Sequence, residues 1–306
     1  MSNNESVSAV ASNREPGLAI LTGVNRSGTS FTANLLLELG FDLGPRDLLL
    51  GADHRNARGY FENKEVLQTN IQLLLGDWVT PENWVDEIEG RRLGYLARWR
   101  MKLAKIQYFL VDPGRIAARA QQAEQADRIK RLAHKYSGSV LNDARFSSTI
   151  SAWAQHVPVA SVLYSFRHPA EVAQSLNRAY GLPIWAGYLF WRQRVLDFFS
   201  QAEGMPLVIV HYERFFASEH REAEVQRLFR FMKRDYRREE ALATLERVLD
   251  HGLRHHVAPG TVRLPARVEA VYQTLQHYHT LHAELSPFRR PPSEIQPAPR
   301  LTSAWK

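Results

Sequence analysis

Two stretches of the chain carry side chains at spacings suited to holding an anion. The first is GVNRSGTS at 23–30, in which Gly23 and Gly28 lie five residues apart and most of the remaining side chains can donate hydrogen bonds. Glycines permit a tight turn, and a turn that opens a helix presents unpaired amides and the positive end of the helix dipole. The hydrogen-bond donors of this loop are Asn25, Arg26, Ser27, Thr29 and Ser30. We therefore expect the loop to cradle a phosphate.

The spacing of this loop is that of a nucleotide-binding loop, G-x-x-x-x-G-K-[ST], with one departure. Thr29 stands where the lysine belongs, and the basic side chain lies instead at Arg26. Because that lysine reaches the outer phosphates of a nucleoside triphosphate, its absence disfavours a kinase or NTPase while preserving the phosphate cradle. The kinase alternative stays open at this stage, with Asp143, which follows the apolar pair 140–141, as its magnesium ligand.

The second anion-binding stretch is the sequence 159–175. An apolar run at 159–166 predicts a buried strand that ends at Arg167, and Pro169 is typical of the first turn of a helix. Ser175 follows Arg167 by eight residues, or about two helical turns. Both side chains can therefore reach one anion above the carboxyl edge of the sheet.

Candidates for acid–base chemistry lie in the polar, turn-rich segment 51–62. It holds His54 and Glu62, and Glu62 follows Tyr60 and Phe61. Burial beside aromatic rings would raise the pKa of Glu62 toward the working pH of a general base. The alternative is that Glu62 only complements the dipole of the following helix. Glu62 and His54 are both candidates for the base.

The remaining pattern predicts the elements that position these groups. Apolar runs at 18–22, 140–141, 159–166 and 207–210 predict buried strands, and amphipathic stretches at 30–39 and 219–232 predict helices. Strands that alternate with helices indicate an α/β fold, with a central parallel sheet covered on both faces to give three layers. We expect a polar, disordered start at 1–17, a single domain at 18–286 and a proline-rich tail at 287–306.

An Arg- and Lys-rich segment interrupts this α/β pattern at about 84–137. Its apolar residues are spaced by three and four, which predicts an amphipathic helical insertion that packs its apolar face and exposes its basic one. These apolar residues are Leu96, Trp99, Leu103, Ile106 and Leu110. A second amphipathic helix is expected at 267–285. Its histidines, His277, His279 and His282, are interpreted as packing or surface residues, and no metal site is expected.

Composition sets further limits on function. The chain of 306 residues contains no cysteine, which excludes disulfides, iron–sulfur clusters, cysteine metal sites and thiol nucleophiles. A formal net charge of +7 favours anionic partners without naming them. We expect no secretory signal and no membrane-spanning helix, and hence a cytoplasmic protein.

The segment VNRSGTSF at 24–31 resembles the 5′-phosphosulfate-binding loop of sulfotransferases that use 3′-phosphoadenosine 5′-phosphosulfate (PAPS). The resemblance implies a P-loop-NTPase-like fold in which Arg26 contacts the transferring sulfuryl group and its bridging oxygen. Asn25 and Ser27 to Ser30 would surround the 5′-phosphate, and Phe31 would stack on adenine. By the same resemblance, Arg167 and Ser175 would bind the 3′-phosphate, and Arg254 would lie in a late loop that closes over it.

The likeness covers roughly 18–80 and 139–264, with softer matches at GYFE (59–62) and at LNDAR (141–145). The resemblance at GYFE favours Glu62 as the base, with His54 second. The LNDAR segment is similar to a K-D-P-R element of bacterial members, with Asn142 and Ala144 as departures. The resemblance implies metal-independent sulfuryl transfer from PAPS to a hydroxyl of a carbohydrate, glycoconjugate or other natural product, tyrosine included, with 3′,5′-adenosine bisphosphate (PAP) as product. The alternatives are a kinase or NTPase, a catalytically silent nucleotide-binding protein, and a nucleic-acid or anionic-surface binder that uses the Arg-rich insertion; we expect no nucleic-acid partner.

Overall fold

The computed structural model describes residues 17–53, 56, 59–78, 80–109, 112–249 and 262–290. Two predicted site residues, His54 and Arg254, lie outside the described residues.

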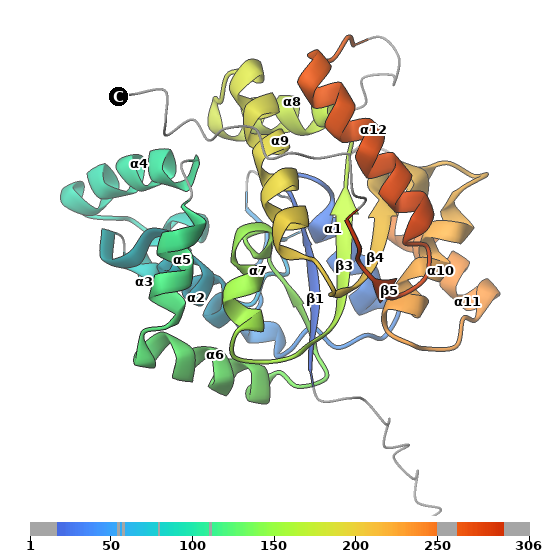
Figure 1. Ribbon diagram of the computed structural model, residues 1–306, viewed down its shortest axis with the longest axis horizontal. Helices are drawn as coiled ribbons and strands as arrows, with labels where there is room; N and C mark the ends of the chain where they lie inside the picture. Colours follow the sequence, from blue (N-terminus) through green and yellow to red (C-terminus); the bar gives the residue numbers. More distant parts are fainter. Residues whose placement is uncertain are drawn as a thin grey trace, which may run out of the picture.

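A five-stranded sheet forms the centre of the protein (Figure 1). Its strands are β1 (Leu18–Gly23), β2 (Val140–Asn142), β3 (Val159–Phe166), β4 (Pro206–His211) and β5 (Ser286–Pro287), in the spatial order β2-β1-β3-β4-β5. The first four strands in this order pair in parallel, and β5 pairs antiparallel with β4. The predicted central parallel sheet is therefore confirmed, and the carboxyl ends of β1, β2 and β3 meet at one edge.

Alternating residues of these strands face two separate hydrophobic cores. Ile20, Val162 and Ile209 belong to one core. Their neighbours Leu21 and Leu163 belong to the other, together with Val208. Since successive side chains of a strand point to opposite faces, a sheet with apolar residues at both sets of positions must be covered on both sides.

Helices supply that cover. One face packs against α1 (Thr29–Glu38), α10 (Arg221–Phe231) and α11 (Arg238–Val248). The other packs against α7 (Phe146–Ala154), α8 (Pro169–Tyr180), α9 (Ile184–Gln201) and α12 (Ala266–Leu281). In Figure 1, α7, α9 and α12 lie in front of the sheet and α1 lies behind it. This arrangement is the three-layer α/β fold that the sequence predicts.

Five further helices form a lateral unit, seen at the left of Figure 1: α2 (Lys64–Leu75), α3 (Pro81–Ile88), α4 (Tyr95–Phe109), α5 (Pro113–Ala120) and α6 (Ala123–Lys135). The predicted insertion is thus helical. The prediction of which face of α4 packs against the protein is wrong at the outer end of this helix. Leu96 is 66% exposed and Trp99 is 55% exposed, while Met101 and Ala104 are buried. The helix packs through the row of Met101 and Ala104, so the predicted stripe faces solvent at its first two positions.

The outer side of β4 is covered by several different groups. Leu207 pairs with Ser286 of β5, and the Ile209 amide donates to the His282 carbonyl at 3.1 Å. The His211 amide donates to a carboxylate oxygen of Glu224 at 2.9 Å. Phe288 is fully buried, so the packed part of the chain extends past the expected boundary at 286.

The histidines of α12 are largely packed. His279 and His282 are buried, and the Nε2 atom of His279 lies 2.8 Å from a Glu224 carboxylate oxygen. Across the part of the chain that the structure describes, no three His, Asp or Glu side chains are grouped to hold a metal ion. Within the same described residues, no helix has the length and apolar character needed to cross a membrane.

Candidate functional site

The loop between β1 and α1 is shaped for close approach of an anion. Arg26 has φ 73° and Gly28 has φ 94°, which turns the backbone sharply before the helix. Gly28 is the N-cap of α1, no side chain caps the helix there, and its first turn contains no acidic residue. The first amides of a helix have no acceptor within the helix, and its dipole is positive at this end. The loop therefore offers donors and no opposing charge.

Neighbouring elements hold the loop in this shape. The Ser27 hydroxyl donates to the Ser165 carbonyl at 2.9 Å, and the Ser165 hydroxyl donates to the Ser27 carbonyl at 3.0 Å. The Ser27 amide donates to the Val24 carbonyl. Both donors of Ser27 are thus engaged, and they fix the loop to β3; the role of Ser27 as a phosphate ligand remains a prediction. A Cβ added to Gly28 would lie 2.3 Å from Cδ2 of Tyr212, which makes glycine necessary there.

The two predicted half-sites meet directly. The Nε atom of Arg26 donates a hydrogen bond to the Ser175 hydroxyl at 3.0 Å, although 149 residues separate them in sequence. Ser175 is buried on α8, and Arg26 is half-buried. The structure therefore brings the basic residue of the first loop to the serine of the second.

Arg167 lies at the end of β3 with two carboxylates beside it. Its Nη2 atom donates to Glu171 at 2.8 Å, and its Nε atom lies 3.8 Å from Glu213. The guanidinium carbon lies 4.8 Å from the ring centre of Tyr212. The buried Nε atom has no hydrogen-bond acceptor among the described residues. The two carboxylates therefore orient the Arg167 guanidinium, a setting that sequence spacing did not reveal.

Phe31 and Ser30 contact the segments that flank the loop. The ring centre of Phe31 lies 5.5 Å from that of Tyr212 and 5.4 Å from that of Phe216. The half-exposed Phe31 ring therefore belongs to an aromatic group beside the loop, a suitable place for a flat ligand. The Asn56 amide donates to the Ser30 hydroxyl at 3.1 Å, which ties the segment containing Glu62 to α1.

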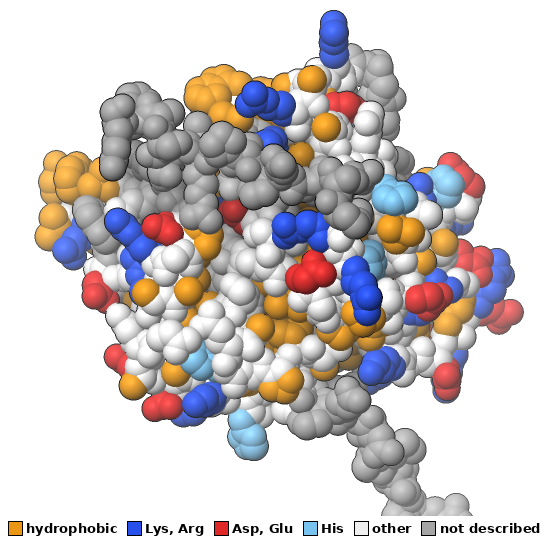
Figure 2. All heavy atoms as spheres, viewed as in Figure 1, with side chains coloured by type: hydrophobic (Ala, Val, Ile, Leu, Met, Phe, Trp, Pro, Cys, Tyr) orange, Lys and Arg blue, Asp and Glu red, His pale blue; other side chains and the backbone are white. Residues whose placement is uncertain are grey.

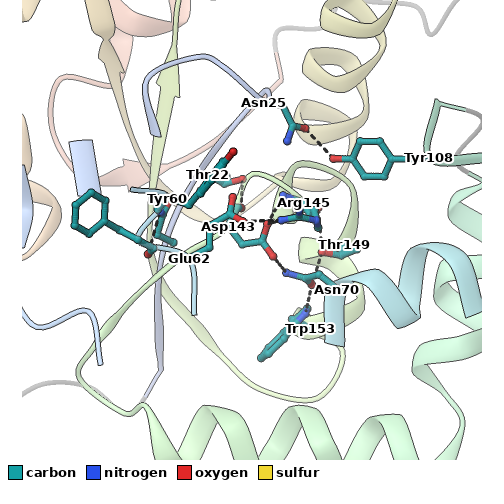
Figure 3. A network of polar contacts seen from close by, with 12 residues as sticks. Thr22, Asn25, Tyr60, Glu62, Asn70, Tyr108, Asp143, Arg145, Thr149 and Trp153 are labelled. Atoms are coloured by element: carbon teal, nitrogen blue, oxygen red, sulfur yellow. Dashed lines mark hydrogen bonds and ion pairs between the residues drawn. The ribbon is translucent and has the colours of Figure 1, made fainter. Parts of the chain in front are cut away.

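Glu62 belongs to a buried ionic group at the same edge of the sheet (Figure 3). The Nη1 atom of Arg145 lies 2.9 Å from a Glu62 oxygen and 2.7 Å from Oδ1 of Asp143, so two carboxylates share one guanidinium. Burial raises the pKa of Glu62 to about 7; Arg145 opposes the increase and Asp143 adds to it. Burial, the main cause, thus gives Glu62 the raised pKa that a general base at this position would need.

The alternative role of Glu62, as a carboxylate at a helix start, does not fit the geometry. Asn63 is the N-cap of α2, and its side-chain oxygen accepts from the amides of Glu65 and Val66 at 3.0 Å and 3.3 Å. Glu62 precedes the cap, and its carboxylate turns to Arg145. Its role as a base remains a prediction.

The carboxylate of Asp143 is occupied on both sides. Oδ1 accepts from the amide and the guanidinium of Arg145, and Oδ2 accepts from the Asn70 amide at 2.8 Å. Asn70 in turn accepts hydrogen bonds from Thr149 and Trp153 through its Oδ1 atom (Figure 3). This arrangement disfavours Asp143 as a magnesium ligand, because both oxygens already have donors fixed by the fold.

Tyr108 joins the helical insertion to the anion loop, and sequence reasoning missed it. Its hydroxyl donates to the Asn25 side-chain oxygen at 2.8 Å (Figure 3). The guanidinium carbon of the buried Arg194 lies 4.8 Å from the Tyr108 ring centre, and burial raises the pKa of Tyr108. An aromatic residue near the end of an amphipathic helix gives no sequence signal for such a contact.

Neither a family model nor a curated protein matches this chain. Among solved structures, the chain is similar to the sulfotransferase domain from the Synechococcus PCC 7002 olefin synthase. The identity is 18% and the TM-score is 0.43, over 91% of this chain and 97% of that one.

Proposed function

We propose that this protein is a PAPS-dependent sulfotransferase that transfers a sulfuryl group to a hydroxyl of a carbohydrate, glycoconjugate or other natural product. The observation that carries the proposal is the hydrogen bond from Arg26 to Ser175 at 3.0 Å. It unites, at one edge of the sheet, two sequence motifs that resemble the two halves of a PAPS site.

The groups around this contact suit a ligand with two phosphate positions and a flat base. The α1 terminus offers amides without a capping side chain, and Arg167 holds a buried Nε donor without an acceptor among the described residues. Phe31 lies beside them with other aromatic rings. The site thus combines cationic donors, from the two arginines, with neutral donors, from the helix amides. An aromatic surface lies near the start of α1.

The chemistry of this transfer needs an activated sulfuryl group, which bound PAPS supplies. The hydroxyl oxygen of the acceptor forms a bond to sulfur while the bond from sulfur to the 5′-phosphate oxygen breaks in line. Arg26 stabilises the negative charge on the departing phosphate oxygen, and Glu62 accepts the proton that the hydroxyl loses. A carboxylate with a pKa of about 7 is matched to this task, since it is partly ionised near neutral pH yet basic enough to hold a proton.

Calorimetric titration with PAP and, separately, with ATP and magnesium tests the donor site. We expect tight PAP binding that does not change when magnesium is removed, and little response to ATP. Preference for ATP with magnesium would overturn the proposal in favour of a phosphotransferase, and absence of binding to both would overturn it in favour of a protein without a nucleotide site.

Substitution of Arg167 tests the assignment of the second half-site. Arg167→Ala removes a charge-assisted contact worth about 1.5–3 kcal/mol and should weaken PAP binding roughly 10- to 100-fold. Arg178→Ala, on the exposed side of the same helix that carries Ser175, is the matched control and should leave PAP affinity unchanged. Equal affinities of the two variants would contradict the assignment.

A further inference from the structure

The outer end of α4 presents large apolar side chains to solvent. Tyr95 is 81% exposed, Leu96 is 66% exposed and Trp99 is 55% exposed. They occupy the first turns of the helix and form an apolar group at the left edge of the molecule in Figure 2. Exposed aromatic and aliphatic side chains gathered in one place usually mark a contact surface.

Cationic side chains are interleaved with this apolar group. Arg98, Arg100 and Lys102 are exposed on the same helix, and Arg92 is exposed just before it. Within the described residues, none of these four forms an ion pair, whereas Arg91 pairs with Asp86 and Glu89. The same region contains a cavity of about 590 Å³ lined by Glu87, Arg91, Arg92, Arg98, Met101 and Lys102. Its lining carries four cationic side chains and one acidic side chain.

A second apolar group lies at the junction of α8 and α9. Tyr180, Ile184, Trp185 and Leu189 are between 37% and 68% exposed. In Figure 1 this junction lies at the top of the view, toward which the parallel strands point, and α4 lies at the upper left. Both groups therefore lie toward the carboxyl edge of the sheet, the side that carries the Arg26 loop.

We propose that the outer end of α4 and the α8–α9 junction form a docking surface for an anionic lipid bilayer. Helix α4 carries Trp and Tyr rings, an aliphatic side chain, and Arg and Lys side chains that form no ion pair with the described residues. This is the composition of a segment that lies in the membrane interface. The cationic cavity is large enough for a phosphate headgroup beside the helix. This proposal does not depend on the proposed function.

The combination of cationic and apolar side chains favours a bilayer over other occupants. A soluble polyanion would use the cations but would leave Leu96 and Trp99 in water, and a neutral apolar partner would leave four cations unmatched. A bilayer surface of anionic lipids satisfies both kinds of side chain, because its headgroups carry charge and its acyl boundary accepts apolar rings. Docking in this way would turn the carboxyl edge of the sheet toward the membrane.

Vesicle sedimentation of the full chain tests this surface. We expect binding to vesicles of phosphatidylcholine mixed with phosphatidylglycerol and much weaker binding to phosphatidylcholine alone. Each Lys or Arg near an anionic bilayer contributes about 1 kcal/mol, or roughly fivefold in affinity. The double substitution Arg98→Gln and Lys102→Gln should therefore weaken binding about 25-fold, and Leu96→Ser with Trp99→Ser should weaken it further.

Matched controls are available at exposed positions elsewhere. Arg237 has an 81% exposed side chain, and Leu281 is 55% exposed on α12. Arg237→Gln should lower vesicle binding much less than the substitution of Arg98 or of Lys102. Leu281→Ser should leave vesicle binding unchanged. Equal binding to both kinds of vesicle, or equal effects of control and α4 variants, would overturn the proposal. Binding of heparin through Arg98 and Lys102 without vesicle binding would also overturn it, in favour of a site for soluble polyanions.

Discussion

The carboxyl edge of the sheet is chemically divided into a donor side and an acid side. On the donor side, between β1 and β3, Arg26 bonds to the hydroxyl of Ser175, and helix amides lack a capping side chain. On the acid side, beside β2, the carboxylates of Glu62 and Asp143 share the guanidinium of Arg145. The donor side thus offers positive charge and hydrogen-bond donors to a ligand, whereas the acid side uses its cation internally and retains a carboxyl group that can hold a proton. A site that moves an anionic group and a proton needs both.

Substitution of Glu62, on the acid side, should have the largest effect on turnover. Glu62→Gln keeps the size of the side chain but removes its ability to accept a proton, and general bases contribute about 10²–10⁴-fold to rate. We expect sulfuryl transfer to fall by that factor in initial-rate assays while PAP affinity measured by calorimetry stays the same. Near-normal turnover would place the base elsewhere, and a parallel loss of PAP binding would show that the two sides are not separate.

The pH dependence of kcat gives a second test of whether Glu62 accepts the proton. Because burial raises the pKa of Glu62 to about 7, the ionised fraction of this carboxyl group increases as pH rises through that value. We expect kcat to fall about tenfold for each pH unit below the pKa and to level off above it. The residual turnover of Glu62→Gln should lack this step; a rising limb that persists in the variant would assign it to another group.

Arg145→Met should mainly reduce stability. The substitution leaves two buried carboxylates without their shared guanidinium, and breaking such a buried pair costs about 3–5 kcal/mol. Denaturant unfolding should show this loss, and the double variant Arg145→Met with Glu62→Gln should recover part of it. Arg115→Met, at an exposed ion pair, is the control and should change the free energy of unfolding by less than about 1 kcal/mol.

Gly28→Ala tests the shape of the donor side. The new Cβ would lie 2.3 Å from the Tyr212 ring at a positive φ, so the loop must shift and PAP binding should be lost. Gly40 also has a positive φ but has open space around it, so Gly40→Ala reports the backbone strain alone. That control should cost about 1 kcal/mol in unfolding experiments and leave PAP affinity unchanged. Comparable PAP affinity of both variants would contradict the role of the loop.

Tyr108→Phe should have the smallest effect. It removes one hydrogen bond, from the Tyr108 hydroxyl to Asn25, which is worth about 0.5–1.5 kcal/mol. We expect PAP affinity to fall about two- to tenfold by calorimetry, because the insertion would no longer support the loop. Tyr188→Phe on α9 is the control; the same decrease in both variants would indicate a general effect of removing a hydroxyl.

Local features of the donor side were predictable from sequence, because they depend on neighbours along the chain. The glycine spacing at Gly23 and Gly28, the strand before Arg167 and the interval to Ser175 all specify backbone shape within a few residues. The engagement of the Ser27 hydroxyl was not predictable, since it depends on Ser165 of a distant strand.

The acid side and the insertion depend on contacts between distant segments. Burial of Glu62 was foreseen, but its guanidinium partner lies 83 residues away, and the contact of Tyr108 with Asn25 also spans 83 residues. The predicted apolar stripe of α4 had the correct helical period. Periodicity alone does not say which row of side chains meets the protein, and the row of Met101 and Ala104 packs instead of Leu96 and Trp99.

Strand β5 has only two residues, so it covers little of the side of β4 that faces away from β3. If β5 were the only cover, most of this side would be an open sheet edge. The Ile209 amide instead donates to a backbone carbonyl of the α12 end, and the His211 amide donates to the carboxylate of Glu224. The Ile209 carbonyl accepts from the guanidinium of Arg227. These groups occupy the hydrogen-bonding positions that another extended chain would need, so the edge is protected against strand addition between molecules. Loss of Glu224 and Arg227 together would therefore make this protein prone to aggregate through its sheet.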